Sequence, residues 1–172
     1  MRVFATCRCV AVASLLCLSV GASALTITYT ATDLADLTAG EDLWRYDYAV
    51  DGAFAAFEGF RVVFAPGAYS VLQSPQPSAS ADWSTFVVEP DTSLPADGEF
   101  NAQAPQAASA IGVPFSVEFA WHGAGAPIAQ PFDLFDGNFD VLSSGSTSAV
   151  PLPTPSVLLL GALLPLMRRR RR

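Results

Sequence analysis

The chain has 172 residues, of which 51% are hydrophobic, and its formal net charge is −7. That value conceals a strong asymmetry: between residues 25 and 150 only Arg45 and Arg61 oppose all 16 Asp and Glu residues, so this part alone has a formal charge of −14. So negative a surface repels a phosphate backbone, which excludes nucleic-acid binding by the middle of the chain.

The first 24 residues have the features of a secretory signal peptide. Two arginines among the first eight residues give a positive start, residues 10–20 are apolar, and Ala22 and Ala24 supply the small side chains that signal peptidase requires. We therefore expect a signal peptide over residues 1–24, cleaved after Ala24. The alternative is an uncleaved N-terminal anchor, which the shortness of the apolar run disfavours.

All three cysteines, at positions 7, 9 and 17, lie inside this predicted signal peptide. The mature chain would therefore have no disulfide, no thiolate metal site and no cysteine nucleophile. Its stability must then come from a hydrophobic core, for which aromatic residues are available. We expect the following aromatic residues in that core: Trp44, Tyr46, Tyr48, Phe60, Phe64, Trp83, Phe86, Phe115, Phe119 and Trp121.

From residue 25 to about residue 144 the dominant hydrophobic period is two. The clearest case is the stretch PFSVEFAW, in which Phe115, Val117, Phe119 and Trp121 alternate with small or polar residues. Such alternation predicts half-buried strands whose apolar side chains point inward. Strands are predicted over residues 25–31, 43–50, 60–64, 69–72, 83–88, 114–121, 130–135 and 139–144.

Turn-forming glycines and prolines separate these segments and would interrupt any long helix. Only residues 31–43 suggest a helical turn, with Thr32 or Asp33 as its N-cap. Short strands at a spacing of roughly ten residues are typical of an all-β domain. We therefore predict a single antiparallel β-sandwich over residues 25–144, with a jelly-roll-like arrangement as the alternative, followed by a Ser/Pro linker over residues 145–155.

Three carboxylates, Asp133, Asp136 and Asp140, fall close together in the stretch FDLFDGNFD. Because Ca²⁺ prefers several converging oxygen ligands, these residues are candidates for a Ca²⁺ site. Their spacing matches neither an EF-hand loop nor a repeat-in-toxin nonapeptide, and alternate carboxylates in a hairpin can simply solvate its outer face. No other cofactor is expected.

His122 is the single histidine of the chain. With one histidine and no mature cysteine, the usual zinc and copper sites cannot be built. A catalytic base at this position would need a nucleophile and an orienting carboxylate, and the sequence assigns neither. No catalytic residue is therefore predicted, and the protein is expected not to be an enzyme.

The tryptophans leave a second possibility open. Trp44, Trp83 and Trp121 could stack on sugar rings, and two of the carboxylates could hydrolyse a glycosidic bond if they lay about 5 to 9.5 Å apart in a cleft. Their alternation with polar residues favours core packing instead. A groove lined by two aromatic side chains and two close carboxylates would support the carbohydrate-binding or hydrolytic alternative.

Residues 157–167 form a short apolar run that is followed by five arginines. A helix of this length spans about 16 Å, against a hydrocarbon core of about 30 Å, so the run is a marginal membrane span. We predict a short transmembrane helix over residues 156–167 and a cytoplasmic arginine cluster over residues 168–172. The anchoring residues are Val157, Leu158, Leu159, Leu160, Leu163, Leu164, Arg168, Arg169, Arg170, Arg171 and Arg172.

The motif Val150, Pro151, Leu152 and Pro153 precedes this run. A proline motif, a short apolar helix and an arginine cluster in this order resemble the PEP-CTERM sorting signal of exopolysaccharide-producing Gram-negative bacteria. The usual motif reads Val-Pro-Glu-Pro, and Leu152 stands in place of its glutamate, as in a Val-Pro-Leu-Pro variant of the signal. The resemblance implies recognition by exosortase, a membrane-embedded cysteine transpeptidase that cleaves near the motif and releases or transfers the protein outward.

This resemblance implies an export pathway for the protein and a role outside the cell. We expect processing by signal peptidase and exosortase, an intermediate anchored in the inner membrane, and a final location at the cell surface or outside the cell. A structural or adhesive role in an exopolysaccharide or biofilm matrix follows. An ordinary C-terminal membrane anchor is the alternative for the tail. Residues 121–147 also resemble, more loosely, the last hairpin of exported β-rich domains that carry this signal, which supports the sandwich.

Overall fold

The computed structural model describes residues 25–75 and 82–150. The predicted signal peptide with its cleavage site at Ala24, the motif residues 151–153, the membrane helix and the arginine cluster lie outside the described residues. Within the described part, no helix is long and apolar enough to cross a membrane.

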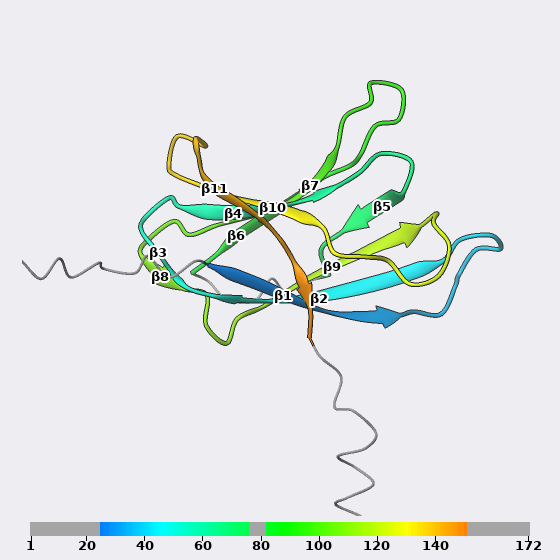
Figure 1. The fold of residues 1–172 in the computed structure, drawn as a ribbon, viewed down its shortest axis with the longest axis horizontal. Coiled ribbons are helices and arrows are strands. Elements are labelled where there is room, and N and C mark those ends of the chain that lie inside the picture. Colours follow the sequence, from blue (N-terminus) through cyan, green and yellow to red (C-terminus); the bar gives the residue numbers. More distant parts are fainter. Residues whose placement is uncertain (1–24, 76–81, 151–172) are drawn as a thin grey trace, which may run out of the picture.

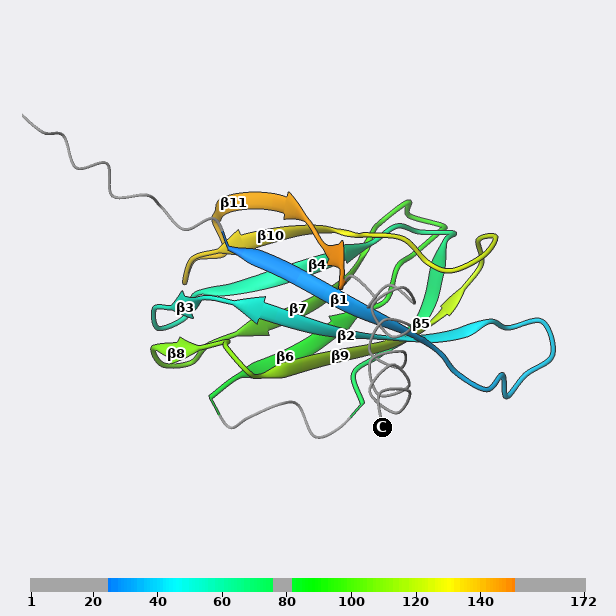
Figure 2. The same ribbon diagram turned by 60° about the horizontal axis from the view of Figure 1, so that its bottom comes forward.

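The described strands form two five-stranded sheets and one small two-stranded sheet. The first sheet has the order β12-β1-β2-β9-β5, with the bounds Ser148–Ala149, Thr26–Asp33, Leu43–Asp51, Pro114–Trp121 and Tyr69–Gln73. The second sheet has the order β11-β10-β4-β7-β6, with the bounds Val141–Ser146, Pro131–Phe135, Gly59–Phe64, Gly98–Gln103 and Ser84–Val88. The small sheet pairs β3 (Ala53–Phe54) with β8 (Ala108–Ser109). The two large sheets lie over one another as the layers of a sandwich (Figures 1 and 2).

Neighbouring strands run antiparallel with one exception, because β12 pairs in parallel with β1. The chain passes repeatedly between the sheets: β4 follows β2 into the second sheet, and β5 returns to the first. The predicted all-β class and its antiparallel pairing are therefore confirmed. Each of the eight predicted strands is present, with ends that differ by at most two residues from those expected.

The core is aromatic and lies between the two sheets. Phe60 of β4 and Phe100 of β7 both contact Phe115 of β9, with ring centroids 5.0 Å and 6.5 Å apart. All three side chains are at most 2% exposed. The alternation seen in the sequence explains this packing, since Phe115, Val117 and Phe119 are buried on the inner face of β9.

The inner strand β7, which lies next to the edge strand β6, was not predicted. It carries a single large apolar residue, Phe100, and its next inward residue is Ala102, so its apolar alternation is weak. Its position between β4 and β6 supplies hydrogen-bonded neighbours on both sides. Backbone pairing and one buried ring therefore hold a strand that side-chain pattern alone does not reveal.

The helical turn predicted over residues 31–43 is wrong. Strand β1 continues through Asp33, and residues 34–42 connect it to β2. The carboxylate of Asp36 accepts a hydrogen bond from the backbone N–H of Leu43 at 3.0 Å. Short polar side chains that can cap a helix can equally bind backbone groups in a turn, and here the turn is formed.

Two expectations about burial in the second sheet are also wrong. Phe86 was placed in the core, but it is 46% exposed because it points to the outer face of the edge strand β6. The strand predicted over residues 139–144 was expected to be half-buried, whereas every residue of β11 is exposed. Both strands are edges of the sheet, where a side chain has neighbours on only one side.

The sheet extends beyond the predicted domain boundary at residue 144. Gln130 donates its backbone N–H to the Thr147 hydroxyl at 2.9 Å, and the Val150 N–H donates to the Tyr29 carbonyl at 2.9 Å. The Val150 bond holds the end of β12 against β1, and the Gln130 bond holds Thr147, the residue before β12, beside the start of β10. The serine-rich stretch, predicted as the start of a linker, therefore contributes a strand because backbone groups alone suffice for pairing.

Candidate functional site

The three candidate Ca²⁺ ligands do not converge. Asp133 lies on the outer face of β10, where its carboxylate contacts the Arg61 guanidinium at 2.8 Å and accepts a hydrogen bond from the Ser144 hydroxyl. Asp136 accepts hydrogen bonds from the backbone N–H groups of Asn138 at 2.8 Å and Asp140 at 3.0 Å, which fixes the β10–β11 turn. Among the described residues, no group of three or more His, Cys, Asp or Glu is placed to hold a metal ion.

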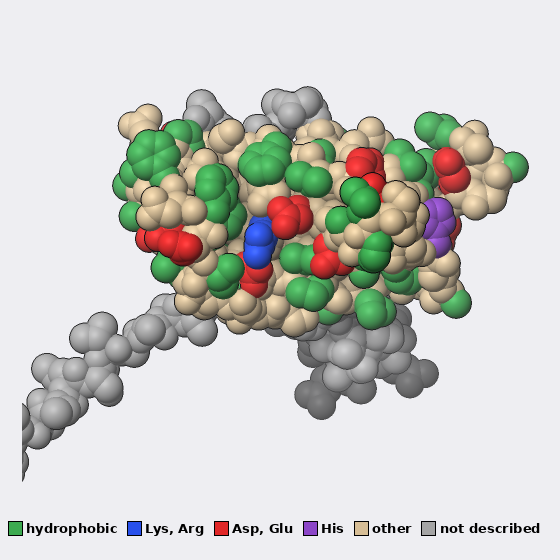
Figure 3. Space-filling view, turned by 90° about the horizontal axis from the view of Figure 1, so that it is seen from above, with side chains coloured by type: hydrophobic (Ala, Val, Ile, Leu, Met, Phe, Trp, Pro, Cys, Tyr) green, Lys and Arg blue, Asp and Glu red, His purple; other side chains and the backbone are tan. Residues whose placement is uncertain are grey.

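Arg61 lies between two carboxylates on the outer face of the second sheet. In addition to Asp133, its guanidinium contacts Glu99 at 3.5 Å, and the Asn101 amide donates to the same Glu99 carboxylate at 3.1 Å. On the face drawn in Figure 3, a basic side chain lies between acidic ones. The Ser144 hydrogen bond and then Arg61 hold the pKa of the Asp133 carboxyl below its usual value. Arg61 is thus paired with a carboxylate on each neighbouring strand, Asp133 of β10 and Glu99 of β7.

The structure supplies a partner that the sequence could not assign to His122. The imidazole Nε2 lies 2.7 Å from the Ser70 hydroxyl across the β5–β9 pair. Among the described residues, no carboxylate contacts this imidazole, and the pair is exposed on the surface. The contact between Ser70 and His122 is therefore a cross-strand hydrogen bond at the surface, to which the described residues add no orienting carboxylate.

The three tryptophans pack within the domain. Trp83 is 4% exposed and lies among core phenylalanines, with its ring centroid 5.2 Å from that of Phe115. Trp44 and Trp121 are half-buried, and their indole N–H groups donate to the Asp42 carboxylate at 2.8 Å and the Gly125 carbonyl at 2.7 Å. The ring of Trp83 is therefore closed to a ligand, and Trp44 and Trp121 pack against the core with part of each side chain exposed.

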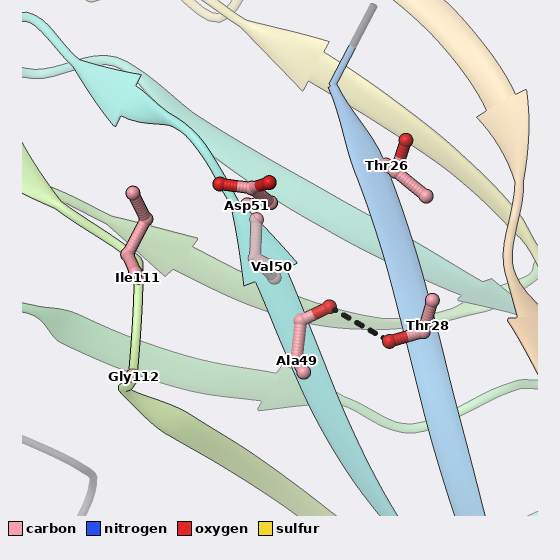
Figure 4. Close-up of a pocket in the computed structure, with 7 residues that line it drawn as sticks. All are labelled: Thr26, Thr28, Ala49, Val50, Asp51, Ile111 and Gly112. Carbon is pink, nitrogen blue, oxygen red and sulfur yellow. Dashed lines mark hydrogen bonds between the residues drawn. The ribbon is translucent and has the colours of Figure 1, made fainter. Parts of the chain in front are cut away.

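A shallow groove lies on the outer face of β1 and β2 (Figure 4). It has a volume of about 480 Å³. Its walls include Thr26, Thr28 and Asp51, together with Ile111 and Gly112 from the loop that precedes β9. Gly112 has φ of +77°, a conformation that glycine adopts without strain, and the turn leaves Ile111 66% exposed. Asp51 is the single ionisable side chain in the lining, and no aromatic ring contributes. The groove thus lacks the paired carboxylates and aromatics that glycoside hydrolysis would require.

A second feature, which the sequence analysis missed, lies at one end of the second sheet. We call it the apolar end and define it as Phe57, Phe139, Val141 and Leu142, whose exposed fractions range from 50% to 58%. The turns that carry Phe57 and Phe139 are adjacent because Gly59 of β4 pairs with Phe135 of β10. Figure 3 shows hydrophobic side chains gathered at the end of this face where the β10–β11 turn lies in Figure 1.

Both phenylalanines of the apolar end have strained backbones. Phe57 has φ of 67° and Phe139 has φ of 65°, in the left-handed region that bulky residues avoid. Such a conformation costs about 1–2 kcal/mol for each residue. One signal of this strain is visible in the residues themselves, since each phenylalanine stands in a turn-like stretch, AAFEG or DGNFD, where glycine or asparagine would be expected.

Comparison with known proteins adds little to this geometry. No protein-family model and no curated protein matches the sequence. Among solved structures, a chain of a type I cohesin–dockerin complex from Clostridium thermocellum is similar, with a TM-score of 0.30 and 9% sequence identity over 73% of this chain and 99% of that chain. A likeness of this size carries no information about a shared partner.

Proposed function

We propose that this protein is an exported, non-enzymatic β-sandwich with a structural or adhesive role at the cell surface or in an exopolysaccharide or biofilm matrix. In this proposal signal peptidase removes residues 1–24, the tail anchors the intermediate in the inner membrane, and exosortase processes the chain at the Val150–Pro153 motif. In this proposal the protein acts by being presented outside the cell and does not convert a substrate.

The observation that supports this proposal is the position of the fold relative to the two processing sites. Strand β1 begins at Thr26, two residues after the expected cut at Ala24. At the other end, Val150 is the first motif residue and makes the hydrogen bond to Tyr29 that closes the β1–β12 pair. The described sandwich is therefore complete between the two sites, and removal of either flanking segment would take no described strand with it.

The intact mass of the secreted product tests the proposal directly, because it fixes both cleavage sites. Replacing Pro151 and Pro153 by alanine should leave the chain at full length in the inner membrane. A matched control is Pro155→Ala, which changes a proline of the same segment outside the motif and should be processed normally. Unchanged processing and release of the double variant would show that the motif has no part in sorting.

The groove supports a second candidate function, the binding of a hydroxyl-rich neutral saccharide. Asp51 can accept hydrogen bonds from sugar hydroxyls, threonines line the same wall, and the negative surface disfavours an anionic polymer. Titration with neutral oligosaccharides, followed by NMR, should shift signals around Asp51 and not in the Asp51→Asn variant. The exposed Asp97→Asn variant is the control. Identical titrations of the two variants would eliminate this candidate.

A further inference from the structure

The last described residues cross from one sheet to the other. After β11 the chain leaves the second sheet and reaches the edge of the first, where β12 lies beside β1 (Figures 1 and 2). We call Thr147, Ser148, Ala149 and Val150 the latch. Strand β12 pairs with only two of the eight residues of β1, and the side chains of Ser148, Ala149 and Val150 are exposed. Backbone hydrogen bonds, and not side-chain burial, therefore hold these three residues.

Thr147 is the one buried side chain of the latch, with 3% of its surface exposed. Its N–H donates to the Gln130 carbonyl at 2.9 Å, and its hydroxyl oxygen accepts the Gln130 N–H at 2.9 Å. Gln130 is itself 1% exposed, and its side-chain oxygen accepts a hydrogen bond from the Tyr48 hydroxyl at 2.8 Å. A single residue thus ties the latch to the core, and loss of its hydroxyl would leave a buried N–H without a partner, which is unfavourable.

The strands on either side of the latch have other partners. Strand β1 pairs with β2 along eight residues, and β10 pairs with both β11 and β4. Release of residues 147–150 would break the pairing with β1 and the bonds of Thr147, while all other described strand pairs stay formed. Segments with few buried contacts open locally at a smaller free-energy cost than global unfolding. The latch is therefore a segment that opens while the sandwich stays folded.

The closed latch withholds the start of the motif Val150–Pro153. The Val150 N–H donates to the Tyr29 carbonyl at 2.9 Å. Because proline has no N–H, Val150 and Leu152 carry the only backbone donors of the four motif residues. One of these two donors is thus engaged within the sheet. An enzyme that binds an extended segment through its main chain needs such groups free.

We propose that the latch regulates access to this motif, so that a protease acts there only on chains in which residues 147–150 have left β1. The cleavage rate then follows the population of the open form, which Thr147 and its bonds to Gln130 keep low. The inference rests on the proposed function for the identity of the processing enzyme, whereas the latch itself is a property of the folded domain. In this way the domain, and not the motif alone, sets the rate of processing.

Limited proteolysis of the full chain in mild detergent tests the latch without exosortase. Elastase cleaves after small residues, and the bond between Ala149 and Val150 lies within the latch. Mass spectrometry should show cleavage of this bond about tenfold faster in Thr147→Val than in the wild type, because valine keeps the shape of the side chain and lacks the acceptor. The matched control is Thr92→Val, the same change at an exposed loop position, which should be cleaved at the wild-type rate.

Two further variants separate local opening from global unfolding. Thr28→Cys with Ser148→Cys places two thiols at a paired position of β1 and β12. The oxidised protein should be cleaved at the Ala149–Val150 bond about tenfold more slowly than the same protein after reduction, because the disulfide keeps the latch closed. Val62→Ala truncates a fully buried side chain of β4 and lowers the thermal unfolding midpoint. It should leave the cleavage rate of this bond unchanged, since β4 does not pair with the latch.

Three results would overturn the inference: equal cleavage rates in Thr147→Val and Thr92→Val, a rate that does not depend on the disulfide, or an acceleration in Val62→Ala as large as that in Thr147→Val. In an expressing bacterium, Thr147→Val should also be processed at the motif faster than Thr92→Val, and equal rates would overturn the regulatory role. Failure of the proposed function gives a different result. The wild-type chain would then stay at full length in the cell while the elastase rates still followed the latch, which supports the inference for a protease in general.

Discussion

Replacing Phe57 and Phe139 one at a time by asparagine and by alanine measures the backbone strain of the apolar end. Both residues have nearly the same φ and the same exposed fraction. They differ in one respect, because the Phe139 ring stacks on Phe135 with centroids 5.1 Å apart, whereas no ring stacking on Phe57 is observed in the described structure. The four variants therefore separate the strain from the stacking.

The expected changes in the free energy of unfolding are the sum of three contributions. Asparagine relieves most of a left-handed cost of about 1–2 kcal/mol. Loss of the buried half of a phenylalanine side chain costs about 1 kcal/mol, since full burial contributes about 1.5–3 kcal/mol. Loss of the stacked pair costs a further ~1 kcal/mol. Phe57→Asn should therefore be more stable than the wild type by about 0.5 kcal/mol, and Phe139→Asn less stable by a similar amount. Each alanine variant should be about 1 kcal/mol less stable than its asparagine counterpart, because alanine keeps the strain.

Urea denaturation followed by tryptophan fluorescence provides the assay, because Trp83 is buried in the core and reports global unfolding. The decisive comparison is asparagine against alanine at the same position. Equal stability of the two variants at both positions would show that the backbone is not strained there. A Phe57→Asn variant that loses more stability than Phe139→Asn would refute the role assigned to the stacked pair.

Three further predictions concern the core, the charged face and the cation site. Phe60→Ala should lower the free energy of unfolding by about 3–5 kcal/mol in urea denaturation because the ring is fully buried, whereas Phe86→Ala should change it by less than about 1 kcal/mol; similar losses would contradict the burial described. The lowered pKa of Asp133 contributes stability that is present above the unfolded-state pKa of about 4 and is lost as pH falls through the folded-state value, so the difference in urea midpoint between the wild type and Asp133→Asn should shrink below about pH 4. If the difference in urea midpoint between the wild type and Asp133→Asn stays constant down to acid pH, the contacts of Asp133 with Arg61 and Ser144 do not lower its pKa. Millimolar Ca²⁺ should leave the thermal midpoint unchanged because the carboxylates of Asp133 and Asp136 are engaged by Arg61 and by backbone N–H groups, and a rise in midpoint would contradict this expectation.

Side-chain alternation predicted the strands that have large apolar residues on one face. In β2, Tyr46, Tyr48 and Val50 are buried as expected, and Arg45 and Asp47 are only partly buried on the other face. Side-chain alternation did not reveal β7. There, one phenylalanine and one alanine on the inner face are enough to hold the strand, because it lies between two other strands. Alternation also failed for Phe86 and β11, since it indicates which side chains share a face and not whether anything covers that face.

The candidate site was predicted less well than the fold. The sequence identified Asp133, Asp136 and Asp140 as neighbours but could not show that an arginine from β4 and backbone groups of a turn would occupy two of them. The Ser70 partner of His122 comes from a strand 52 residues away. The strain at Phe57 and Phe139 depends on backbone angles, which residue types alone do not specify.

The parallel pairing of β12 with β1 has a mechanical consequence. The first and last strands of the sandwich lie side by side and point the same way, so a pull between the two ends of the domain acts along the strands. Their hydrogen bonds would be loaded together in shear and would not open one after another. A force applied between Thr26 and Val150 would thus be resisted first by the pairs Thr28–Ser148 and Tyr29–Ala149, and the remaining strands would bear the load only after these pairs had separated.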